Sequence, residues 1–467
     1  MSAPTRQLFG TDGIRGEAGK YPLDAETVLR LGQAAADVFL ALRAERGEGH
    51  HDWPSVVIGK DTRQSGDMLE TAIAAGLNSR GIDVRLAGVI PTPAVAWLTR
   101  ETGAAFGIVI SASHNPFGDN GVKFFGPDGY KLDDALELAI ERRLLAEKVD
   151  PPAEPLGAAQ IGRTGILEDA QERYIEFVCA MSHDDRALFR GKKFALDSAN
   201  GAAFETSEAI LRKLGAEVVP FFQEPNGLNI NRDCGCTHPE VIERLVRETG
   251  ADAGISHDGD ADRVLLCDET GSVLDGDELM AIGAIDLLER GELAGDTLVA
   301  TVMSNAGLEA ALQEHGGHLV RSKVGDRYVM EEMRKGGFNF GGEQSGHLIY
   351  RDLNTTGDGI VAAVQLLSVM VRTGKPLGEL RKTLTKFPQA QRNLPVSSKP
   401  PVETLPEVRK TIETAESELK AAGAGRVLVR YSGTEALVRI LVEGSDGDQI
   451  EGIADRIRDA FAAAIGA

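Results

Sequence analysis

The 467-residue chain is poor in aromatic side chains and has no excess of positive charge. Aromatic residues make up 5% of the chain, and it contains 50 lysines and arginines but 71 aspartates and glutamates. The net charge of −21 repels nucleic acids and anionic membranes, and few rings are available to stack on bases. We therefore expect neither nucleic acid nor membrane as a partner, and an anionic small ligand would need locally gathered cations.

Cysteine and long apolar runs are also scarce. The four cysteines do not form zinc-ribbon pairs, so reduced thiols are expected. The longest apolar stretch, residues 359–371, is too short to span a bilayer, and charged residues interrupt any apolar segment near the N-terminus. Neither a P-loop nor a strand followed by G-x-G-x-x-G occurs, which argues against a kinase or a dehydrogenase. These absences predict a soluble, cytoplasmic protein.

Glycine, in contrast, is abundant, with 54 residues, and it punctuates a repeated pattern. Three segments each read as a strand, a polar turn, a helix stopped by glycine, and a second strand, which is the signature of a βαβ unit. Units so far apart in the sequence favour three α/β domains of similar design. Their ranges are 56–59, 67–80 and 84–86; 194–197, a helix to 214 and 218–221; and 298–302, a helix to 314 and 319–320.

The C-terminal part follows a different pattern. Residues 426–429 and 438–442 read as strands around a polar turn, and residues 449–464 read as an amphipathic helix, which predicts a small α+β domain. Prolines mark a boundary or long loop at 151–155 and a linker between 388 and 406. Residues 43–53 read as an additional loop without an assigned role. The predicted domains are 1–165, 166–271, 272–385 and 386–467.

The first segment with unusual chemistry is SASHNP, residues 111–116, directly after the apolar strand 106–110. Polar loops at the carboxyl ends of parallel strands are where α/β folds place ligands. Two hydroxyls, an imidazole and an amide there are compatible with a nucleophilic or phosphorylated serine. An ordinary turn is the alternative, because serine, asparagine and proline all favour turns.

The second segment, DGDADR, carries Asp258, Asp260 and Asp262 at alternate positions. Three carboxylates that converge in one loop suit Mg²⁺ or Ca²⁺. An EF-hand does not fit, because Arg263 stands where its turn needs glycine. Arg263 also suggests that the site handles a phosphate together with the metal. A solvated acidic turn is the alternative.

Three further segments combine glycine with polar groups. Residues 430–435 (RYSGTE) with Arg439 offer guanidinium forks, hydroxyls and backbone N–H groups, which suit a phosphate dianion. Residues 341–347 (GGEQSGH) read as a sugar-hydroxyl loop, and residues 323–327 (KVGDR) add two cations. Residues 10–16 (GTDGIRG) add one arginine. A plain hairpin and glycine-punctuated loops are the alternatives.

With these motifs in this order, the sequence resembles the α-D-phosphohexomutase superfamily, and within it the bacterial phosphoglucosamine mutases, from Phe9 to Arg439. The resemblance implies an α/β fold with three similar α/β domains of mixed sheets and a smaller C-terminal α+β domain around a central active-site cleft. It implies an isomerase that interconverts glucosamine 6-phosphate and glucosamine 1-phosphate through a phosphoserine and a bisphosphorylated sugar, on the route to UDP-N-acetylglucosamine. Gln344, where phosphomannomutase relatives more often carry methionine, favours the glucosamine branch.

The resemblance also implies roles residue by residue. It makes Ser113 the phosphoserine and assigns one Mg²⁺ per chain to Asp258, Asp260 and Asp262, with a phosphoserine oxygen completing the site. Around the reacting centre it places Arg15, Lys123 and His347, and it leaves the proton carrier open. The implied contacts to sugar and phosphate are His114, Arg263, Lys323, Arg327, Glu343, Ser345, Arg430, Ser432, Gly433, Thr434 and Arg439.

A hexosamine phosphate is the expected small-molecule partner, and a hexose 1,6-bisphosphate is expected to prime the phosphoenzyme. The oligomeric state stays open, with a homodimer as one option. The rival functions are a phosphomannomutase/phosphoglucomutase, a non-catalytic sugar-phosphate binding protein on the same fold, and a metal phosphohydrolase. Retention of Ser113 with all three aspartates argues against the binding protein, because binding alone needs neither.

Overall fold

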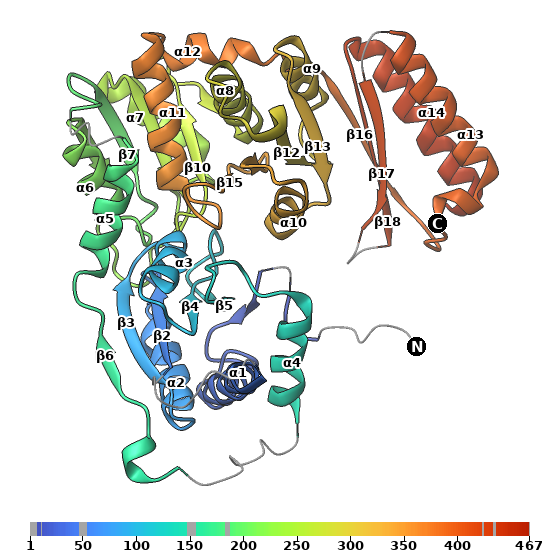
Figure 1. Ribbon diagram of the computed structural model, residues 1–467. Helices are drawn as coiled ribbons and strands as arrows, with labels where there is room; N and C mark the ends of the chain where they lie inside the picture. The colour runs from blue at the N-terminus through green and yellow to red at the C-terminus, as the bar shows by residue number, and fades with distance from the viewer. Residues whose placement is uncertain are drawn as a thin grey trace.

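The computed structural model describes residues 7–10, 12–45, 54–146, 156–182, 187–422, 425–432 and 436–466. Within these residues the strands form four sheets that follow one another along the chain. The first three sheets are mixed and the fourth is antiparallel, which confirms the predicted fold class. Figure 1 shows the fourth sheet beside the third, with its two helices on the side away from the rest of the molecule.

The N-terminal region builds a six-stranded sheet. Its strands are β1 (Ile14–Glu17), β2 (Ser55–Lys60), β3 (Asp83–Val89), β4 (Phe106–Ile110), β5 (Asp119–Phe125) and β6 (Thr164–Ile166), in the order β1-β5-β4-β2-β3-β6. Its helices are α1 (Ala25–Glu45), α2 (Ser65–Asn78), α3 (Thr92–Glu101) and α4 (Asp134–Leu145). The parallel strands β2 and β4 are buried apolar runs, as expected for strands covered on both faces. The serine segment therefore begins at the carboxyl end of a central strand.

The second region builds a five-stranded sheet in the order β11-β10-β9-β7-β8. Its elements are α5 (Ala170–Ala180), β7 (Lys193–Asp197), α6 (Thr206–Lys213), β8 (Glu217–Phe221), α7 (Pro239–Thr249), β9 (Ala253–His257), β10 (Val264–Cys267) and β11 (Val273–Leu274). Strand β7 is parallel to β8 and β9, whereas β9 turns back antiparallel into β10. That turn carries the three aspartates at the carboxyl end of β9.

The third region builds a four-stranded sheet in the order β13-β12-β14-β15. Its elements are α8 (Gly276–Glu289), β12 (Thr297–Thr301), α9 (Ala306–Glu314), β13 (His318–Ser322), α10 (Asp326–Gly336), β14 (Phe340–Gly342), β15 (Leu348–Tyr350), α11 (Gly359–Thr373) and α12 (Leu377–Leu380). Strand β12 is parallel to β13 and β14, and β14 turns back into β15. The sugar-loop candidate GGEQSGH spans that turn.

The fourth region is the predicted α+β unit. It contains β16 (Gln389–Pro395), α13 (Pro406–Ala421), β17 (Gly425–Tyr431), β18 (Leu437–Gly444) and α14 (Gly447–Ile465), with the strands in the order β16-β18-β17. The prediction of β17, β18 and α14 is confirmed. The interpretation of residues 388–406 as linker was partly wrong, since β16 lies within it. Pro395 ends this edge strand, where a missing N–H costs no ladder hydrogen bond.

The three predicted βαβ units are confirmed as β2-α2-β3, β7-α6-β8 and β12-α9-β13. Of the predicted loop 43–53, Arg43 lies in α1, and residues 46–53 fall outside the described part of the chain, as does the proline-marked boundary at 151–155. The four cysteines all lie in the described part, and none of them forms a disulfide bond there. The domain limits stay predictions.

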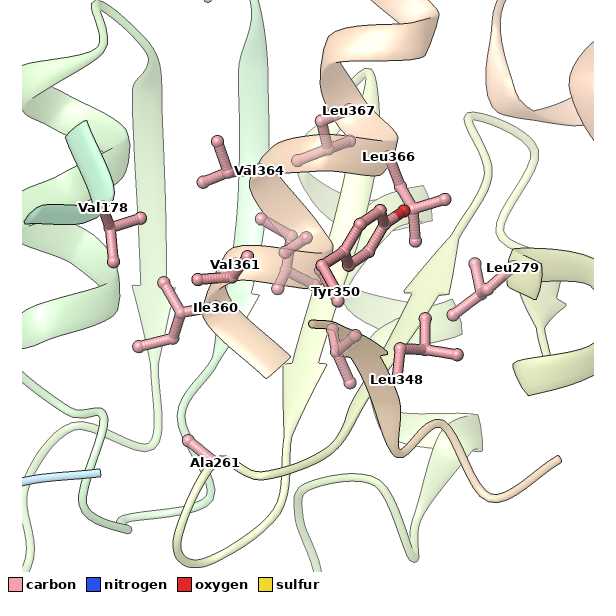
Figure 2. Close-up of a cluster of buried hydrophobic side chains, with 14 of the residues drawn as sticks. Val178, Ala261, Leu279, Leu348, Tyr350, Ile360, Val361, Val364, Leu366 and Leu367 are labelled. Atoms are coloured by element: carbon pink, nitrogen blue, oxygen red, sulfur yellow. The ribbon is translucent and has the colours of Figure 1, made fainter. Parts of the chain in front are cut away.

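Helix α11 accounts for the longest apolar stretch of the sequence. Figure 2 shows Ile360, Val361 and Val364 of this helix facing Val178 of α5, with Tyr350 of β15 nearby. The stretch is thus a helix of the buried core. Among the described helices none is by itself long and apolar enough to cross a membrane, although α11 together with residues 377–383 passes that test as a bent pair, by length and composition alone.

Candidate active site

Ser113 lies in the loop that leaves β4 and is buried, with 1% of its surface exposed. Its backbone φ is +52°, in the left-handed region that residues other than glycine rarely adopt. Its N–H donates to Ser111 Oγ at 2.9 Å, and its own hydroxyl donates to Asp258 Oδ2 at 2.5 Å. The hydroxyl predicted to carry the phosphoryl group therefore points at the predicted metal carboxylates.

The turn between β9 and β10 brings the three aspartates together. One ligand oxygen from each of Asp258, Asp260 and Asp262 lies within 4.8 Å of the others, and all three side chains are buried. Within the described residues, Asp260 Oδ1 and Asp262 Oδ1 have no hydrogen-bond donor. Converging, buried oxygen atoms without donors fit a hard divalent cation such as Mg²⁺.

The electrostatics of the aspartate cluster also fit a divalent cation. Burial, and next the charges of Asp262 and Asp260, hold the pKa of Asp258 well above its usual range. Burial also disfavours the charged form of Asp262, but the nearby Lys123 and His347 lower its pKa overall. Like charges this close repel one another, and a divalent cation would relieve that repulsion.

Lys123, on β5, is the buried cation of the site. Its Nζ lies 2.8 Å from Asp260 Oδ2, 2.9 Å from Asp12 Oδ2 and 3.6 Å from Asp262 Oδ2. Burial alone would lower the pKa of this lysine, but the surrounding carboxylates raise it. Arg15, on β1, pairs with the same Asp12. Both predicted cations of the reacting centre are thus held by carboxylates beside the aspartate cluster.

His347 precedes β15 and lies between two acidic groups. Its Nδ1 is 3.7 Å from Asp262 Oδ1, and its Nε2 is 3.5 Å from Asp326 Oδ2. Burial lowers the pKa of the imidazole, but Asp262 and then Asp326 raise it overall. Lys131 in turn bridges Asp326 and Asp12. One chain of buried and half-buried charges therefore connects the first and third sheets across the site.

A cleft of about 600 Å³ opens over these groups. His114 and Arg263 line it as predicted, and so do Glu343 and Ser345 of the turn between β14 and β15. Glu343 Oε1 accepts the N–H of Gly325 at 3.0 Å, which fixes its carboxylate at the rim. The full lining is Leu8, Gly10, Asp12, Gly13, Arg15, His114, Asp262, Arg263, Thr301, Met303, Val324, Gly325, Asp326, Glu343, Gln344, Ser345 and His347.

The two cations of the KVGDR segment lie apart from that lining. Lys323 is exposed, with its Nζ 5.6 Å from the centre of the Tyr328 ring. Arg327 turns toward α4, where its Nη1 lies 2.5 Å from Asp134 Oδ1 and 3.1 Å from Glu137 Oε2. In this structure Arg327 therefore joins the third region to the first.

Arg430 and Arg439 occupy directly opposed positions on β17 and β18. Opposed residues of an antiparallel pair share one face, and like charges there repel unless an anion lies between them. With Met303, which also lines the main cleft, they border a smaller cavity of about 160 Å³. Ser432 is buried next to β17, and its N–H donates to the Leu437 carbonyl at 2.8 Å. Gly433 and Thr434 lie outside the described residues.

Several residues of the site were not singled out from the sequence. Asp12 and Asp326 lie in two of the glycine-containing segments, residues 10–16 and 323–327, but the sequence analysis assigned neither of them a role in the site. Thr92, at the start of α3, gave no signal, although its hydroxyl donates to Asp260 Oδ2 at 2.6 Å and its N–H to the Asp260 carbonyl at 3.0 Å. Lys131 gave none either, because its partners are remote in sequence.

Four family models match the chain one after another. They are the alpha/beta/alpha domains I, II and III and the C-terminal domain of phosphoglucomutase/phosphomannomutase. The matched residues are 6–150, 172–271, 275–387 and 392–460, in that order. The serine segment, the aspartate turn, the sugar-loop candidate and the two arginines each fall in a different model.

Curated relatives match almost from end to end. A phosphoglucosamine mutase of Syntrophotalea carbinolica is 49% identical over 454 residues, which is 97% of either chain. One of Anaeromyxobacter dehalogenans is 51% identical over 468 residues, covering 99% of this chain and all of the relative.

Solved structures share the fold. A phosphoglucomutase/phosphomannomutase family protein of Burkholderia thailandensis superposes with a TM-score of 0.78 at 25% identity, covering 98% of this chain and 97% of that one. N-acetylphosphoglucosamine mutase of Aspergillus fumigatus, solved with GlcNAc-6P and magnesium, gives 0.65 at 18% identity, covering 98% and 95%. Together with the four family models and the full-length relatives, this places the chain in the phosphoglucosamine mutase branch of the phosphohexomutase superfamily.

Proposed function

We propose that this chain is a phosphoglucosamine mutase, an isomerase that interconverts glucosamine 6-phosphate and glucosamine 1-phosphate. The observation that carries the proposal is the 2.5 Å contact between the buried Ser113 Oγ and Asp258, whose neighbours His114 and Asp262 line the cleft. A serine hydroxyl aimed into a buried carboxylate cluster suits phosphoryl transfer, which depends on positioning and on stabilisation of charge. A protein that only bound sugar phosphates would need neither group.

In the first half of the reaction, phosphorylated Ser113 gives its phosphoryl group to O1 of glucosamine 6-phosphate. The bond between phosphorus and Ser113 Oγ breaks as a bond to the sugar O1 forms, and a bisphosphorylated sugar results. The sugar then turns end for end, and its 6-phosphoryl group returns to Ser113. Glucosamine 1-phosphate leaves, and the phosphoenzyme is restored.

The groups around Ser113 have distinct roles in this proposal. Lys123 and Arg15 are assigned to charge, because each is held against carboxylates beside the cluster. His347, whose contacts to Asp262 and Asp326 are longer, is assigned to take up and return the proton of the sugar hydroxyl. Arg430 and Arg439, with Ser432, Gly433 and Thr434, would hold the phosphate that is not being transferred.

The remaining assignments carry over the roles that the sequence resemblance implies. Glu343 and Ser345 would contact sugar hydroxyls, while His114, Arg263, Lys323 and Arg327 would serve the substrate phosphates. For Arg327 this needs a rearrangement, because its guanidinium is now engaged by α4.

We propose that Asp258, Asp260 and Asp262 hold one Mg²⁺ per chain, completed by the phosphoserine. Bound there, the ion would offset the negative charge that develops on the transferring phosphoryl group. Support comes from the two carboxylate oxygens that lack donors in the described structure and from the magnesium in the fungal N-acetylphosphoglucosamine mutase. Priming by a hexose 1,6-bisphosphate, a cytoplasmic location, a homodimer and the four domain ranges stay predictions.

An intact-mass spectrum tests the proposal most directly. The purified chain, incubated with glucose 1,6-bisphosphate and Mg²⁺, should gain the mass of one phosphate. Ser113→Ala should abolish that gain and nearly all turnover while the chain stays folded, whereas Ser111→Ala should still gain the phosphate. Covalent catalysis should contribute more than ~3 kcal/mol, so a folded Ser113→Ala variant with over about a hundredth of wild-type kcat would contradict the assignment.

Substrate choice needs a separate measurement. We expect kcat/KM to be highest for glucosamine 6-phosphate when it is compared with glucose 6-phosphate and mannose 6-phosphate. A preference for either neutral sugar would favour a phosphomannomutase/phosphoglucomutase. Release of inorganic phosphate in place of glucosamine 1-phosphate would indicate a phosphohydrolase.

A further inference from the structure

Two side chains that do not line the cleft hold the backbone of the serine loop. Arg63 Nη2 lies 3.2 Å from the carbonyl oxygen of Ser113 and 2.5 Å from that of Asn115. Asn231 Nδ2 lies 2.8 Å and 3.1 Å from the same two oxygens. Two carbonyls that bracket His114 are therefore each bound twice, by donors from two different regions of the chain. We refer to Arg63 and Asn231 as the carbonyl clamp.

Arg63 is itself rigidly placed. It lies in the turn after β2, is 2% exposed, and pairs through Nη1 with the buried Asp61. Its own N–H donates to Asp61 Oδ1 at 2.9 Å, which ties the main chain to the same carboxylate. A planar guanidinium held in this way can present its second nitrogen to two carbonyls at once.

Asn231 reaches the serine loop from the second region, which also carries the aspartate cluster. Its backbone is in the left-handed region, with φ of +56°, and its N–H donates to the Ala199 carbonyl at 2.9 Å. Gly259, between two of the aspartates, packs directly on the clamp. A Cβ at position 259 would lie 2.5 Å from the Ser113 carbonyl oxygen and 2.8 Å from Asn231 Nδ2. The aspartate turn, the clamp and the serine loop thus form one contact.

The need for such a clamp follows from where the reacting parts lie. Ser113 and Asp258 are 145 positions apart and belong to different sheets. The left-handed backbone of Ser113 is strained, and such a conformation persists only when its surroundings enforce it. Phosphoryl transfer is sensitive to placement, and an error of about 1 Å can cost roughly a hundredfold in rate.

We infer that Arg63 and Asn231 are positioning residues for phosphoryl transfer, which set the backbone of Ser113 and hence the distance from its Oγ to the metal carboxylates. The inference rests on the proposed mutase function. Neither residue lines the cleft, so the clamp acts on the rate of the chemical step and makes no contact of its own with the substrate.

The test is Asn231→Ala, assayed in the full chain with Mg²⁺ and both hexosamine phosphates. We expect kcat per folded enzyme to fall about 10- to 100-fold, with the KM for glucosamine 6-phosphate and the half-saturating Mg²⁺ concentration within about twofold of wild type. Single-turnover transfer from phosphorylated Ser113, followed by intact mass, should slow by the same factor. A merely structural role would lower Tm and leave kcat per folded enzyme unchanged.

Asn229→Ala is the matched control in the same loop. The Asn229 side chain accepts the N–H of Asn226 at 2.9 Å and donates to the Glu224 carbonyl at 2.9 Å, so both of these hydrogen bonds support its own loop. We expect its kcat to match wild type. An equal loss in Asn229→Ala, or a kcat within twofold of wild type in Asn231→Ala, would overturn the inference.

Two further variants guard against a failure to fold. Arg63→Lys keeps the charge but cannot reproduce the fork, and Asn231→Asp keeps the shape but replaces the donor by an oxygen that repels the carbonyls. Both should show the same loss in kcat at unchanged KM. If wild type neither isomerises glucosamine 6-phosphate nor forms phosphoserine, the proposed function fails; if wild type is active and the clamp variants are equally active, only the clamp fails.

Discussion

At the scale of single residues, the cleft depends on buried charges that neutralise one another. In a chain with net charge −21, Lys123 is surrounded by Asp12, Asp260 and Asp262 at 2.8 to 3.6 Å. Removing one partner from such a group leaves an uncompensated buried charge, which costs far more than an exposed ion pair contributes. The aspartates therefore both recruit a cation and place the lysine.

Asp260→Asn is predicted to weaken Mg²⁺ dependence and kcat together. The amide still offers an oxygen, but one negative charge leaves the predicted metal shell, and the contact to Lys123 loses its ionic character. We expect the half-saturating Mg²⁺ concentration to rise and kcat to fall at least about tenfold, a change of ~1.4 kcal/mol in the barrier. A Mg²⁺ titration of turnover measures both quantities.

Asp128→Asn is the control, since Asp128 is an exposed aspartate outside the cleft lining. It should leave the titration unchanged. If Asp260→Asn also behaves like wild type, the aspartate turn does not hold the metal on which turnover depends.

At the scale of elements, the aspartate turn is shaped by the start of α11. The N–H of Gly359, its first residue, donates to the Ala261 carbonyl at 3.0 Å, and a Cβ at position 359 would lie 2.3 Å from the Arg263 carbonyl oxygen. Figure 2 shows Ala261 on its loop below Ile360 and the buried cluster around α11. The apolar core thus positions the turn that carries the aspartates.

Gly359→Ala is predicted to lower both Tm and kcat, because the added methyl cannot be accommodated without moving the backbone of the aspartate turn. Overpacking of this kind costs about 1–3 kcal/mol, which a thermal melt and a steady-state assay can detect. Gly447→Ala is the matched control. Gly447 is the first residue of α14 and follows an aspartate cap as Gly359 does, but a Cβ at position 447 would meet no atom of the described residues within 4 Å. That variant should be unchanged or slightly stabilised; equal behaviour of the two would contradict the close approach.

The second residue of α8 gives a prediction about pH. Burial raises the pKa of Asp277 to about 6, although its Oδ2 accepts the N–H of Asn305 at 2.9 Å. The folded chain then binds this proton more tightly than the unfolded chain, so stability falls as pH rises from about 4 through 6. The loss amounts to about 3 kcal/mol for a shift of roughly two units.

Asp277→Asn should remove that pH-dependent part. The variant is expected to be more stable than wild type at pH 8 and equal to it near pH 4, as measured by urea unfolding at both pH values. Asp448→Asn, at the same position of α14 but exposed, is the matched control for the substitution itself. A constant difference between Asp277→Asn and wild type at all pH values would mean that the carboxyl does not titrate in this window.

How far the elements were predictable depends on their local pattern. Strands such as β4 and β12 are continuous apolar runs that precede polar turns, so sequence alone located them. Strand β16 was not predicted because it is an edge strand with polar residues and a terminal proline, and this composition is also typical of a linker. Asn231 and Thr92 could not be found by any local pattern, since their partners lie 118 and 168 positions away.

At the scale of the whole molecule, the proposed site draws on all four sheets. Each sheet carries one candidate part: the serine, the three aspartates, the turn with Glu343, and the arginine pair of β17 and β18, which borders a smaller cavity of its own. The sequence supplied each part, but only the resemblance placed them in one cleft. The fourth sheet is attached to the third through Arg426, which pairs with buried Glu443 and donates to the Ser304 carbonyl at 2.7 Å.

Arg430 offers a test of the whole mechanism, because in the proposal one phosphate-binding site must hold either phosphate of the substrate. It faces Arg439 across the two strands, and in the proposal it binds the phosphate that is not being transferred. In the forward direction that is the 6-phosphate, and after the sugar has turned it is the 1-phosphate. The contact is equally present in the ground and transition states, so Arg430→Ala should raise KM more than it lowers kcat.

The size and symmetry of that effect can be stated in advance. Hydrogen bonds to a charged group contribute about 1.5–3 kcal/mol, so kcat/KM should fall roughly ten- to two-hundredfold, and by a similar factor for glucosamine 6-phosphate and glucosamine 1-phosphate. Arg392→Ala, which removes a half-buried arginine of β16 paired with Asp455 and Glu451 of α14, should change neither. Steady-state kinetics in both directions decide the matter. A large loss in one direction only would mean that Arg430 serves a single orientation of the sugar. A mechanism with one phosphate-binding site for both orientations would then have to be abandoned.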